Sequence, residues 1–402
     1  MWSRLHLSDG TGSTGNLPAM SGYTKQQILE RGHSVWAEVD LGAIRHNVAK
    51  LKNMAPAAEL MGVVKGYAYG HGNPASAQAM LQAGASRLGV ARVAEALHLR
   101  DAGVSAPIHV FTETPPEAVP LMIEAGLTPT VYSERYATSL SEAAASSRTT
   151  IAVHVKVDTG MHRVGLPADD VPRAISSIAS HDNLEIEGVW SHLAVADVPD
   201  HPFTRKQLEL FTDVVTKIER TIGPVRYKHI ANSAATMSLP ESHLDLVRCG
   251  VACFGLSPGA SVDAQHLVPA MALRARVNMT KRVPAGEALS YGLSYELDRP
   301  GTIVTVPVGY ADGYDRRLSG RADVLLAGGR HRVSGTVCMD QFMVDVGSKI
   351  VEPGATVTLL GRDGDQLVTA EELAALVGTI NYEITTRVAS RVPRLYLGET
   401  GE

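Results

Sequence analysis

The sequence predicts an α/β protein with an N-terminal (β/α)8 barrel of the TIM type, followed by a mostly β C-terminal domain. Up to about Pro258, short apolar runs alternate with longer Ala-, Leu- and Glu-rich segments, as expected of parallel strands covered by helices. Eight such runs fall within roughly 220 residues, which is the count and size of a (β/α)8 barrel. Beyond about Val268 the helical pattern nearly disappears. Periodicity alone leaves a doubly wound sheet as the alternative.

The eight expected barrel strands are nearly continuous in apolar residues, as strands buried on both faces are. They lie at Leu60–Val64, Leu88–Ala91, Ile108–Phe111, Thr128–Tyr132, Ile151–Val157, Ile186–Trp190, Tyr227–Ala231 and Leu244–Phe254. Helices are expected between them, at Pro74–Ala83, Val93–Ala102, Glu134–Ser146, Pro172–Ser180 and Pro202–Thr221.

Strand-like runs separated by Gly- and Pro-bearing turns dominate the rest of the chain. They lie at Met271–Thr280, Thr302–Val308, Asp323–Leu326, Thr336–Val346 and Thr356–Leu360. One helix is expected at Thr369–Val377, because Thr369 followed by Glu372 three residues later is a capping-box pattern.

The domain prediction has three parts: a leader over residues 1–33, the barrel over 34–265 and the β domain over 266–402. Residues 1–22 are rich in Gly, Ser and Thr and lack the apolar block of a signal peptide. This start is expected to be a disordered leader, or an upstream start with Met20 as the true initiator.

Composition excludes several classes of protein. The net charge is −5 with both signs mixed and no basic run, which argues against a nucleic-acid or anionic-membrane partner. No apolar stretch approaches the ~20 residues that span a bilayer. Cys249, Cys253 and Cys338 are too few for a disulfide framework, and the first two are expected to be buried apolar residues rather than zinc ligands. No metal is expected, and a reducing cytoplasm fits.

Candidate functional residues follow the expected strands, because catalytic groups of such barrels come from the C-terminal ends of strands. A small hydroxyl after the seventh strand and a glycine on the eighth are typical of a phosphate site in these barrels. A lone lysine at a strand end is weak evidence, because most lysines extend to solvent. The residues at these ends are Lys65, Lys156, Asp158, His192, Asn232, Ser233, Arg248 and Gly250.

The segment Val63–Gly72 resembles the cofactor lysine motif of the alanine racemase family, which uses pyridoxal 5'-phosphate. The resemblance extends, in order and with similar spacing, from about Val35 to Leu397, and it implies a (β/α)8 barrel followed by a β domain. The other matching segments are Lys156–Arg163, Trp190–His192, His229–Ser233, Leu246–Gly250, Ser290–Gly292, Gly309–Gly313, Cys338–Gln341 and Asn381–Glu383.

The resemblance implies that Lys65 carries the cofactor and that His192 flanks its pyridine ring. Further cofactor contacts are implied for Tyr69, Asn232, Ser233, Arg248, Gly250, Val251 and Tyr382. Arg248 matches the residue at the ring nitrogen, and His229 the residue that holds this arginine. An arginine only donates hydrogen bonds, so the ring nitrogen should stay unprotonated and its electron withdrawal muted.

Racemisation by this family is implied to use two bases on opposite faces of the cofactor, here Lys65 and Tyr291. Arg163 is implied to contact the substrate carboxylate, and Lys156 matches a position that is carboxylated in many members. Tyr291, Met339 and Asp340 are implied to come from the partner subunit of a head-to-tail homodimer. Tyr310 and Met339 are implied to limit the space beside the substrate, which suits the methyl group of alanine.

Three alternatives remain open at this stage. A racemase that prefers serine, lysine or several amino acids would share every motif. A barrel decarboxylase should place an acid at the ring nitrogen rather than Arg248, and would lack the Tyr291 motif. A non-catalytic pyridoxal-phosphate-binding protein should lack the second domain. The implied role is the supply of D-alanine for peptidoglycan.

Overall fold

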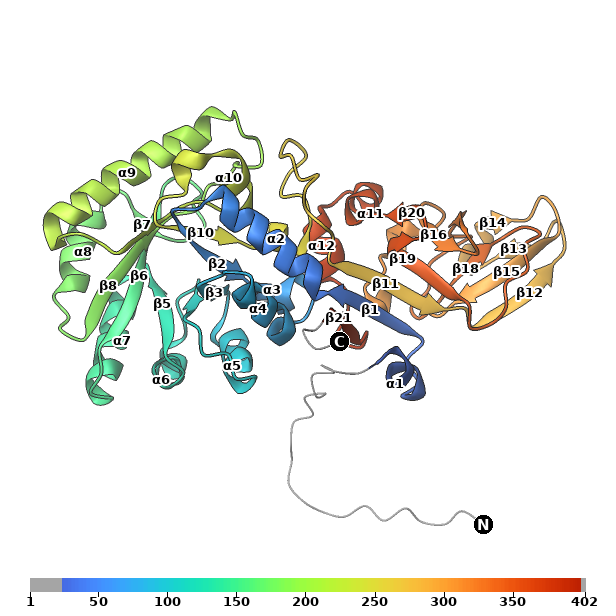
Figure 1. The fold of residues 1–402 in the computed structure, drawn as a ribbon, viewed down its shortest axis with the longest axis horizontal. Helices are drawn as coiled ribbons and strands as arrows, with labels where there is room; N and C mark the ends of the chain where they lie inside the picture. Colours follow the sequence, from blue (N-terminus) through green and yellow to red (C-terminus); the bar gives the residue numbers. More distant parts are fainter. Residues whose placement is uncertain (1–23, 399–402) are drawn as a thin grey trace, which may run out of the picture.

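The computed structural model describes residues 24–398 and divides into the two expected parts. Figure 1 shows a barrel surrounded by helices at one end and a mostly β domain at the other. This arrangement confirms the predicted fold class. Within the described residues, no helix is long and apolar enough to cross a membrane.

Eight parallel strands form the barrel, in the spatial order β10-β2-β3-β4-β5-β6-β8-β9. Backbone hydrogen bonds from Asp245 to Lys228 and from Arg248 to Ala231 join β9 to β10, so that the barrel is nearly closed. The strands are β2 (Glu59–Val63), β3 (Arg87–Val90), β4 (Ile108–Val110), β5 (Leu127–Val131), β6 (Ile151–Asp158), β8 (Leu184–Trp190), β9 (Tyr227–His229) and β10 (Leu246–Cys249), with the short β7 (Leu166–Pro167) beside β6.

Helices cover the outside of the barrel with one apolar face each. In α8 the buried residues Val171, Ala174, Ile175 and Ile178 follow the helical repeat, which explains how this face packs on the strands. The helices are α2 (Leu41–Met54), α4 (Asn73–Gln82), α5 (Val93–Asp101), α6 (Val119–Glu124), α7 (Glu134–Ser146), α8 (Val171–Ala179), α9 (Pro202–Ile222) and α10 (Ser233–Ser238).

The eighth strand is shorter than the expected Leu244–Phe254. It ends at Cys249, and a 3₁₀ turn (Val251–Phe254) follows Gly250. Cys253 therefore lies outside the strand, although Cys249 and Cys253 are both buried and free as expected.

The second domain is built mainly on the sheet β17-β16-β19-β11-β1-β21, with β20 beside β19. Strand β1 (Val35–Asp40), which precedes the barrel, pairs antiparallel with β11 and parallel with β21. The remaining members are β11 (Met271–Arg276), β16 (Asp323–Leu326), β17 (Gly329–Arg332), β19 (Thr356–Asp363), β20 (Gln366–Val368) and β21 (Arg394–Leu397).

Two smaller sheets and two helices complete this domain. The expected strand 271–280 covers β11 and the start of a second strand, β12 (Met279–Val283). The expected strand 336–346 is regular only over β18 (Phe342–Asp345). Thr369 caps α11 by accepting a hydrogen bond from the Glu372 amide, as predicted, whereas α12 was not foreseen. The elements are β12 (Met279–Val283), β13 (Ala288–Leu289), β14 (Tyr295–Glu296), β15 (Gly301–Val306), β18 (Phe342–Asp345), α11 (Ala370–Val377) and α12 (Asn381–Thr386).

The prediction of a disordered leader over residues 1–33 is wrong for its C-terminal part, which forms a helix. Residues 1–23, with Met20, lie outside the described residues. Lys25–Glu30 form the helix α1, and its Ile28 is fully buried against Trp36 and Leu395. A capping box of Thr24 with Gln27 starts this helix, and burial of Ile28 on the second domain adds a tertiary contact that local composition could not predict.

A left-handed turn follows directly after the first barrel strand. Residues 66–69, within the segment labelled α3 (Lys65–Tyr69), have φ between 52° and 63°. Such backbone costs about 1–2 kcal/mol for each residue other than glycine. The Gly66 amide donates to Glu95 Oε1 at 2.7 Å, and the Arg394 Nε donates to the Gly70 carbonyl at 2.9 Å. These contacts hold the turn between the barrel and the second domain.

Gly70→Ala is expected to destabilise the protein more than an ordinary glycine substitution. Gly70 has φ +87°, and an added Cβ would lie 2.0 Å from the Thr385 carbonyl oxygen of α12. Gly103→Ala is a matched control, because Gly103 has φ +82° with nothing within 4 Å. Urea unfolding should show a loss about 1–3 kcal/mol larger for Gly70→Ala, which is the cost of overpacking. Equal losses in the two variants would exclude the packing role of Gly70.

Candidate active site

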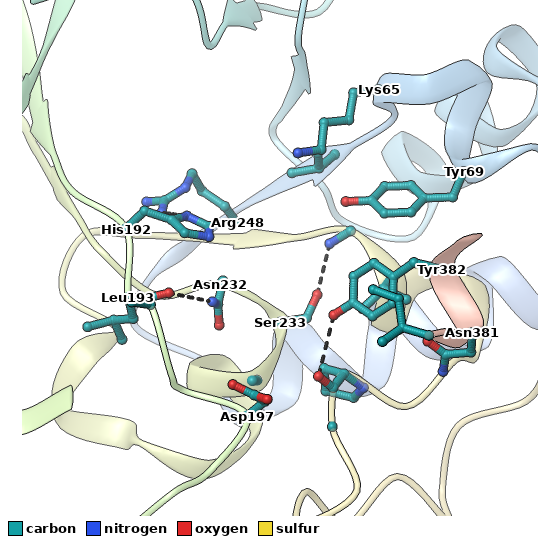
Figure 2. Close-up of a pocket in the computed structure, with 18 of the residues that line it drawn as sticks. Lys65, Tyr69, His192, Leu193, Asp197, Asn232, Ser233, Arg248, Asn381 and Tyr382 are labelled. Carbon is teal, nitrogen blue, oxygen red and sulfur yellow. Dashed lines mark hydrogen bonds between the residues drawn. The ribbon is translucent and has the colours of Figure 1, made fainter. Parts of the chain in front are cut away.

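A cavity of about 940 Å³ opens at the C-terminal mouth of the barrel, where α12 of the second domain covers it. This volume is in the range of pockets that bind small molecules. Figure 2 shows the polar side chains that converge on it. The predicted residues that line it are Lys65, Tyr69, Lys156, Arg163, His192, Asn232, Ser233, Arg248, Gly250, Val251 and Tyr382.

Lys65 follows β2 after a single intervening residue, Val64, and its amine points into this cavity (Figure 2). Burial lowers the pKa of the Lys65 amine, and the positive charges of Arg163 and Arg248 lower it further, while Glu95 opposes them. An amine with a lowered pKa is more often neutral, and a neutral amine is a nucleophile and a base. The site therefore favours the reactive form of Lys65.

Hydroxyl groups gather at another part of the cavity, around Gly250. The Gly250 amide donates to Ser233 Oγ at 3.0 Å, and the Tyr382 hydroxyl donates to the Pro258 carbonyl at 3.4 Å (Figure 2). A Cβ at position 250 would lie 2.3 Å from the Tyr69 hydroxyl oxygen. Glycine thus lets the backbone approach Tyr69 closely, and the resulting cradle of hydroxyl and amide groups suits a phosphate.

Arg248 forms the wall of the cavity from inside the barrel. Its Nη1 donates to His229 Nδ1 at 3.0 Å, and its Nη2 donates to the carbonyls of Ser191 and Ile230 and to His192 Nδ1. Burial lowers the pKa of Arg248 to about 9, which still leaves the guanidinium charged at neutral pH. All these hydrogen bonds use the two terminal nitrogens of Arg248, so its Nε–H is not used by any of them.

His192 and His229 both lie beside this cation in their neutral forms. Burial lowers the pKa of each imidazole well below its usual value, and the charge of Arg248 adds to the effect. His192 lines the cavity, whereas His229 is fully buried behind Arg248.

Lys156 is a second buried amine of the cavity. Its Nζ lies 3.9 Å from the centre of the Trp190 ring. Burial lowers the pKa of Lys156 to about 7, helped by the positive charges of Arg248 and Arg163. The lowered pKa favours the uncharged form of the Lys156 amine. Asp158, at the end of the same strand, instead accepts hydrogen bonds from the Gly160 and His162 amides.

Besides His229, four predicted site residues of the second domain do not line this cavity. Tyr291 lies between β13 and β14, which Figure 1 shows at the end of the molecule away from the barrel, and it is 75% exposed. Tyr310 and Met339 are also exposed, and Asp340 accepts a hydrogen bond from Arg391 at 2.8 Å. Within one chain, Tyr291 thus lies apart from Lys65.

Sequence reasoning missed Glu95 and gave no role to Trp190. Glu95 accepts from the Ala91 and Arg92 amides at the start of α5 as well as from Gly66. An acid in the first turn of a helix is a recognisable capping signal, so the bonds of Glu95 within α5 could have been predicted. Its hydrogen bond to the Gly66 amide could not, because it depends on how the chain folds.

These residues fit pyridoxal phosphate. A buried amine with a lowered pKa, a fixed arginine and the hydroxyl cradle at Gly250 match its aldehyde, its ring nitrogen and its phosphate. Among residues 24–398, no three His, Cys, Asp or Glu side chains are grouped to hold a metal ion.

Comparisons with known proteins agree over nearly the whole chain. The sequence matches the family described as alanine racemase, N-terminal domain, over residues 39–258 and that described as alanine racemase, C-terminal domain, over residues 270–396. An alanine racemase from Carboxydothermus hydrogenoformans is 45% identical over 366 residues, which cover 90% of this chain and 99% of that relative.

Solved structures show the same likeness. The crystal structure of alanine racemase from D-cycloserine-producing Streptomyces lavendulae is 42% identical, with a TM-score of 0.86, and covers 91% of this chain and 97% of that chain. A histidine racemase from Leuconostoc mesenteroides subsp. sake is 31% identical, with a TM-score of 0.82, and covers 91% of this chain and 98% of that chain.

Proposed function

This chain belongs to the alanine racemase family, and we propose on that premise that it interconverts L-alanine and D-alanine with pyridoxal phosphate as cofactor. The observation that carries the proposal is the buried Lys65 amine, which faces the same cavity as Arg248 and the Gly250 cradle. D-alanine made in this way would supply peptidoglycan synthesis. The three cysteines are free, which fits the cytoplasm as the proposed location.

Pyridoxal phosphate, when bound, withdraws electrons from the α-carbon of an amino acid and so makes its α-proton removable. Lys65 would hold the cofactor at its amine and, once released, remove or return the proton on one face. Tyr291 would do the same on the other face, through its phenolic oxygen, for L-alanine. Two bases on opposite faces explain how the product can be the mirror image of the substrate.

The other residues of the cavity would bind and orient. Arg248 would donate its Nε hydrogen to the ring nitrogen, and because a guanidinium stays charged it would leave that nitrogen unprotonated. His192 would lie against the ring. The hydroxyls of Tyr69, Ser233 and Tyr382, with the amides of Gly250 and Val251, would bind the phosphate, and Asn232 would help to shape this end of the cavity. Arg163 would bind the substrate carboxylate.

The active enzyme is proposed to be a head-to-tail homodimer with composite active sites. Tyr291 is exposed and distant from Lys65 within one protomer, so a second copy must bring the two bases together. Met339 and Tyr310 are large side chains exposed in the same domain, as expected of an interface. Tyr310 and Met339 would limit the space beside the substrate, and Asp340 would help to bind it.

Lys156 is proposed to be carboxylated. Its neutral amine would attack carbon dioxide, forming an N–C bond while one C=O bond becomes a carboxylate and a proton leaves to solvent. The carbamate would orient Arg163, whose positive charge already acts on Lys156.

Enzyme supplied with ¹³C-labelled bicarbonate should show a carbamate carbon in its NMR spectrum, and Lys156→Arg should lack it. Removal of carbon dioxide from the buffer should lower activity several-fold, and bicarbonate should restore it, because the carbamate forms reversibly. Lys50→Arg, on the surface of α2, is the control. A spectrum without the signal and activity that is insensitive to bicarbonate would contradict the modification.

A racemase for another amino acid is the second candidate, because the fold is shared by a histidine racemase at 31% identity. One extra methylene changes selectivity by only about 1–3 kcal/mol, so the pocket could accept several side chains.

The deciding experiment incubates the cofactor-loaded enzyme with a panel of L-amino acids and separates the enantiomers by chiral chromatography. Alanine should racemise fastest, with serine slower and lysine and histidine slowest. Faster turnover of another amino acid would assign that substrate instead. An enzyme that binds pyridoxal phosphate and racemises nothing would refute the proposed function and favour a binding protein.

A further inference from the structure

A line of buried polar side chains runs down the inside of the barrel from Arg248. Arg248 Nη1 lies 3.0 Å from His229 Nδ1, and His229 Nε2 lies 2.8 Å from His154 Nδ1. His154 Nε2 lies 3.0 Å from Glu187 Oε2. Both imidazoles are fully buried. Nothing in the proposed function so far uses His154 or Glu187.

The two ends of this line fix every proton in it. Arg248 can only donate, so His229 Nδ1 must accept and His229 must carry its proton on Nε2. That proton is donated to His154 Nδ1, so His154 must also carry its proton on Nε2, where the Glu187 carboxylate accepts it. A second proton on either imidazole would place two donors face to face. The line is consistent only with two neutral histidines in one tautomer each.

The charges agree with this assignment. Burial lowers the pKa of His154 more than the hydrogen bond to Glu187 raises it. Although burial opposes ionisation of Glu187, the bond from His154 and the charges of Arg87 and Arg226 lower the pKa of its carboxyl. Glu187 is therefore ionised and the imidazole beside it is neutral.

The backbone is shaped to bring Glu187 to this place. In the pairing of β6 with β8, Val153 faces Ile186 and His154 faces Gly188, so Glu187 is an extra residue in β8. A bulge of this kind redirects a side chain. At Gly188 a Cβ would lie 2.5 Å from His154 Nδ1, so only glycine leaves room for the imidazole.

We propose that Glu187 is a positioning residue of the racemase, which holds Arg248 toward the cofactor ring through His154 and His229. The proposal rests on the proposed function, because it assigns Arg248 to the ring. No carboxylate of the described chain forms an ion pair with Arg248 directly, so Glu187 supplies its counter-charge from a distance, through the aligned dipoles of two imidazoles. The guanidinium is thereby held in one orientation.

The test uses Glu187→Gln, which keeps the shape of the side chain and removes its charge. The cofactor-loaded variant should lose about tenfold in kcat with KM within about twofold, since the substrate does not touch Glu187. Glu185→Gln, an exposed acid on the same strand, is the control and should leave both constants unchanged.

A double-mutant cycle tests whether Glu187 acts through the histidines. In a His154→Phe background the line is already cut, so Glu187→Gln should cause no further loss of kcat. Independent losses that multiply, or an unchanged kcat in Glu187→Gln, would overturn the proposal.

A spectroscopic measurement separates this proposal from the proposed function. In ¹⁵N-histidine-labelled enzyme, His154 and His229 should each show a single tautomer with the proton on Nε2. In Glu187→Gln the amide oxygen can still accept from His154, and Arg248 still forces His229 Nδ1 to accept, so both histidines should keep their tautomers. The weaker bond to an uncharged acceptor should instead shift the signal of the His154 Nε2 proton upfield. An unchanged signal of the His154 Nε2 proton in Glu187→Gln would overturn the proposed line of hydrogen bonds. If the wild type shows these tautomers but racemises nothing, the proposed function fails while the hydrogen-bonded line stands.

Discussion

Lys65→Ala is expected to abolish racemisation, with a loss of about 10⁴-fold or more, because the variant lacks both the amine that holds the cofactor and one of the two bases. The fold should survive, since the Lys65 amine points into a cavity and not into the core. Chiral chromatography of L-alanine and D-alanine reactions should show loss in both directions. The absorbance of covalently held cofactor should disappear at the same time.

Lys217→Ala is a suitable control, because Lys217 lies on the exposed face of α9. It should leave turnover and absorbance unchanged. A Lys65→Ala enzyme that kept even a tenth of its activity would refute the assignment of Lys65 as a base. Loss of unfolding cooperativity in that variant would instead point to a structural role.

Mixing two inactive variants should restore activity. Tyr291→Phe removes the phenolic oxygen and should lower turnover about 10²- to 10⁴-fold, as expected for loss of a general base. If each site takes Lys65 from one subunit and Tyr291 from the other, a mixed dimer with Lys65→Ala has one intact site and one that lacks both bases. Random exchange of subunits should therefore restore about a quarter of the wild-type activity.

The experiment needs dimers that exchange, which unfolding and joint refolding of the two variants would provide. Each variant refolded alone is the control and should stay inactive. A mixture that stays inactive after joint refolding, while refolded wild type is active, would contradict the composite site. It would show that Lys65 and Tyr291 act within one chain.

Much of the barrel could be predicted because its strands are buried on both faces. Such strands leave continuous apolar runs, and all eight begin within about two residues of the prediction. The eighth was too long, since Gly250 ends the strand without interrupting its apolar character. In the second domain the run 271–280 was predicted as one strand although it holds parts of two, because the break at Val277 and Asn278 carries no Gly or Pro.

The candidate site could be predicted where its residues sit at strand ends and in recognisable motifs. Lys65, His192, Ser233 and Arg248 belong to this group, and all four line one cavity. Features that depend on tertiary contacts left no signal. The left-handed backbone after Lys65 includes residue types that rarely adopt it, and the bulge at Glu187 looks like ordinary strand in the sequence.

The position of β1 has a consequence for the order in which the chain acquires its structure. This strand is made before the barrel, yet its partners β11 and β21 follow about 230 and 350 residues later. During synthesis the barrel can close before β11 and β21 are made, and until then both edges of β1 remain unpaired. A chain that is terminated between the two domains would thus expose β1 as an apolar strand with unpaired backbone edges, which is a template for aggregation. Production of this protein should therefore depend on uninterrupted translation of its second half.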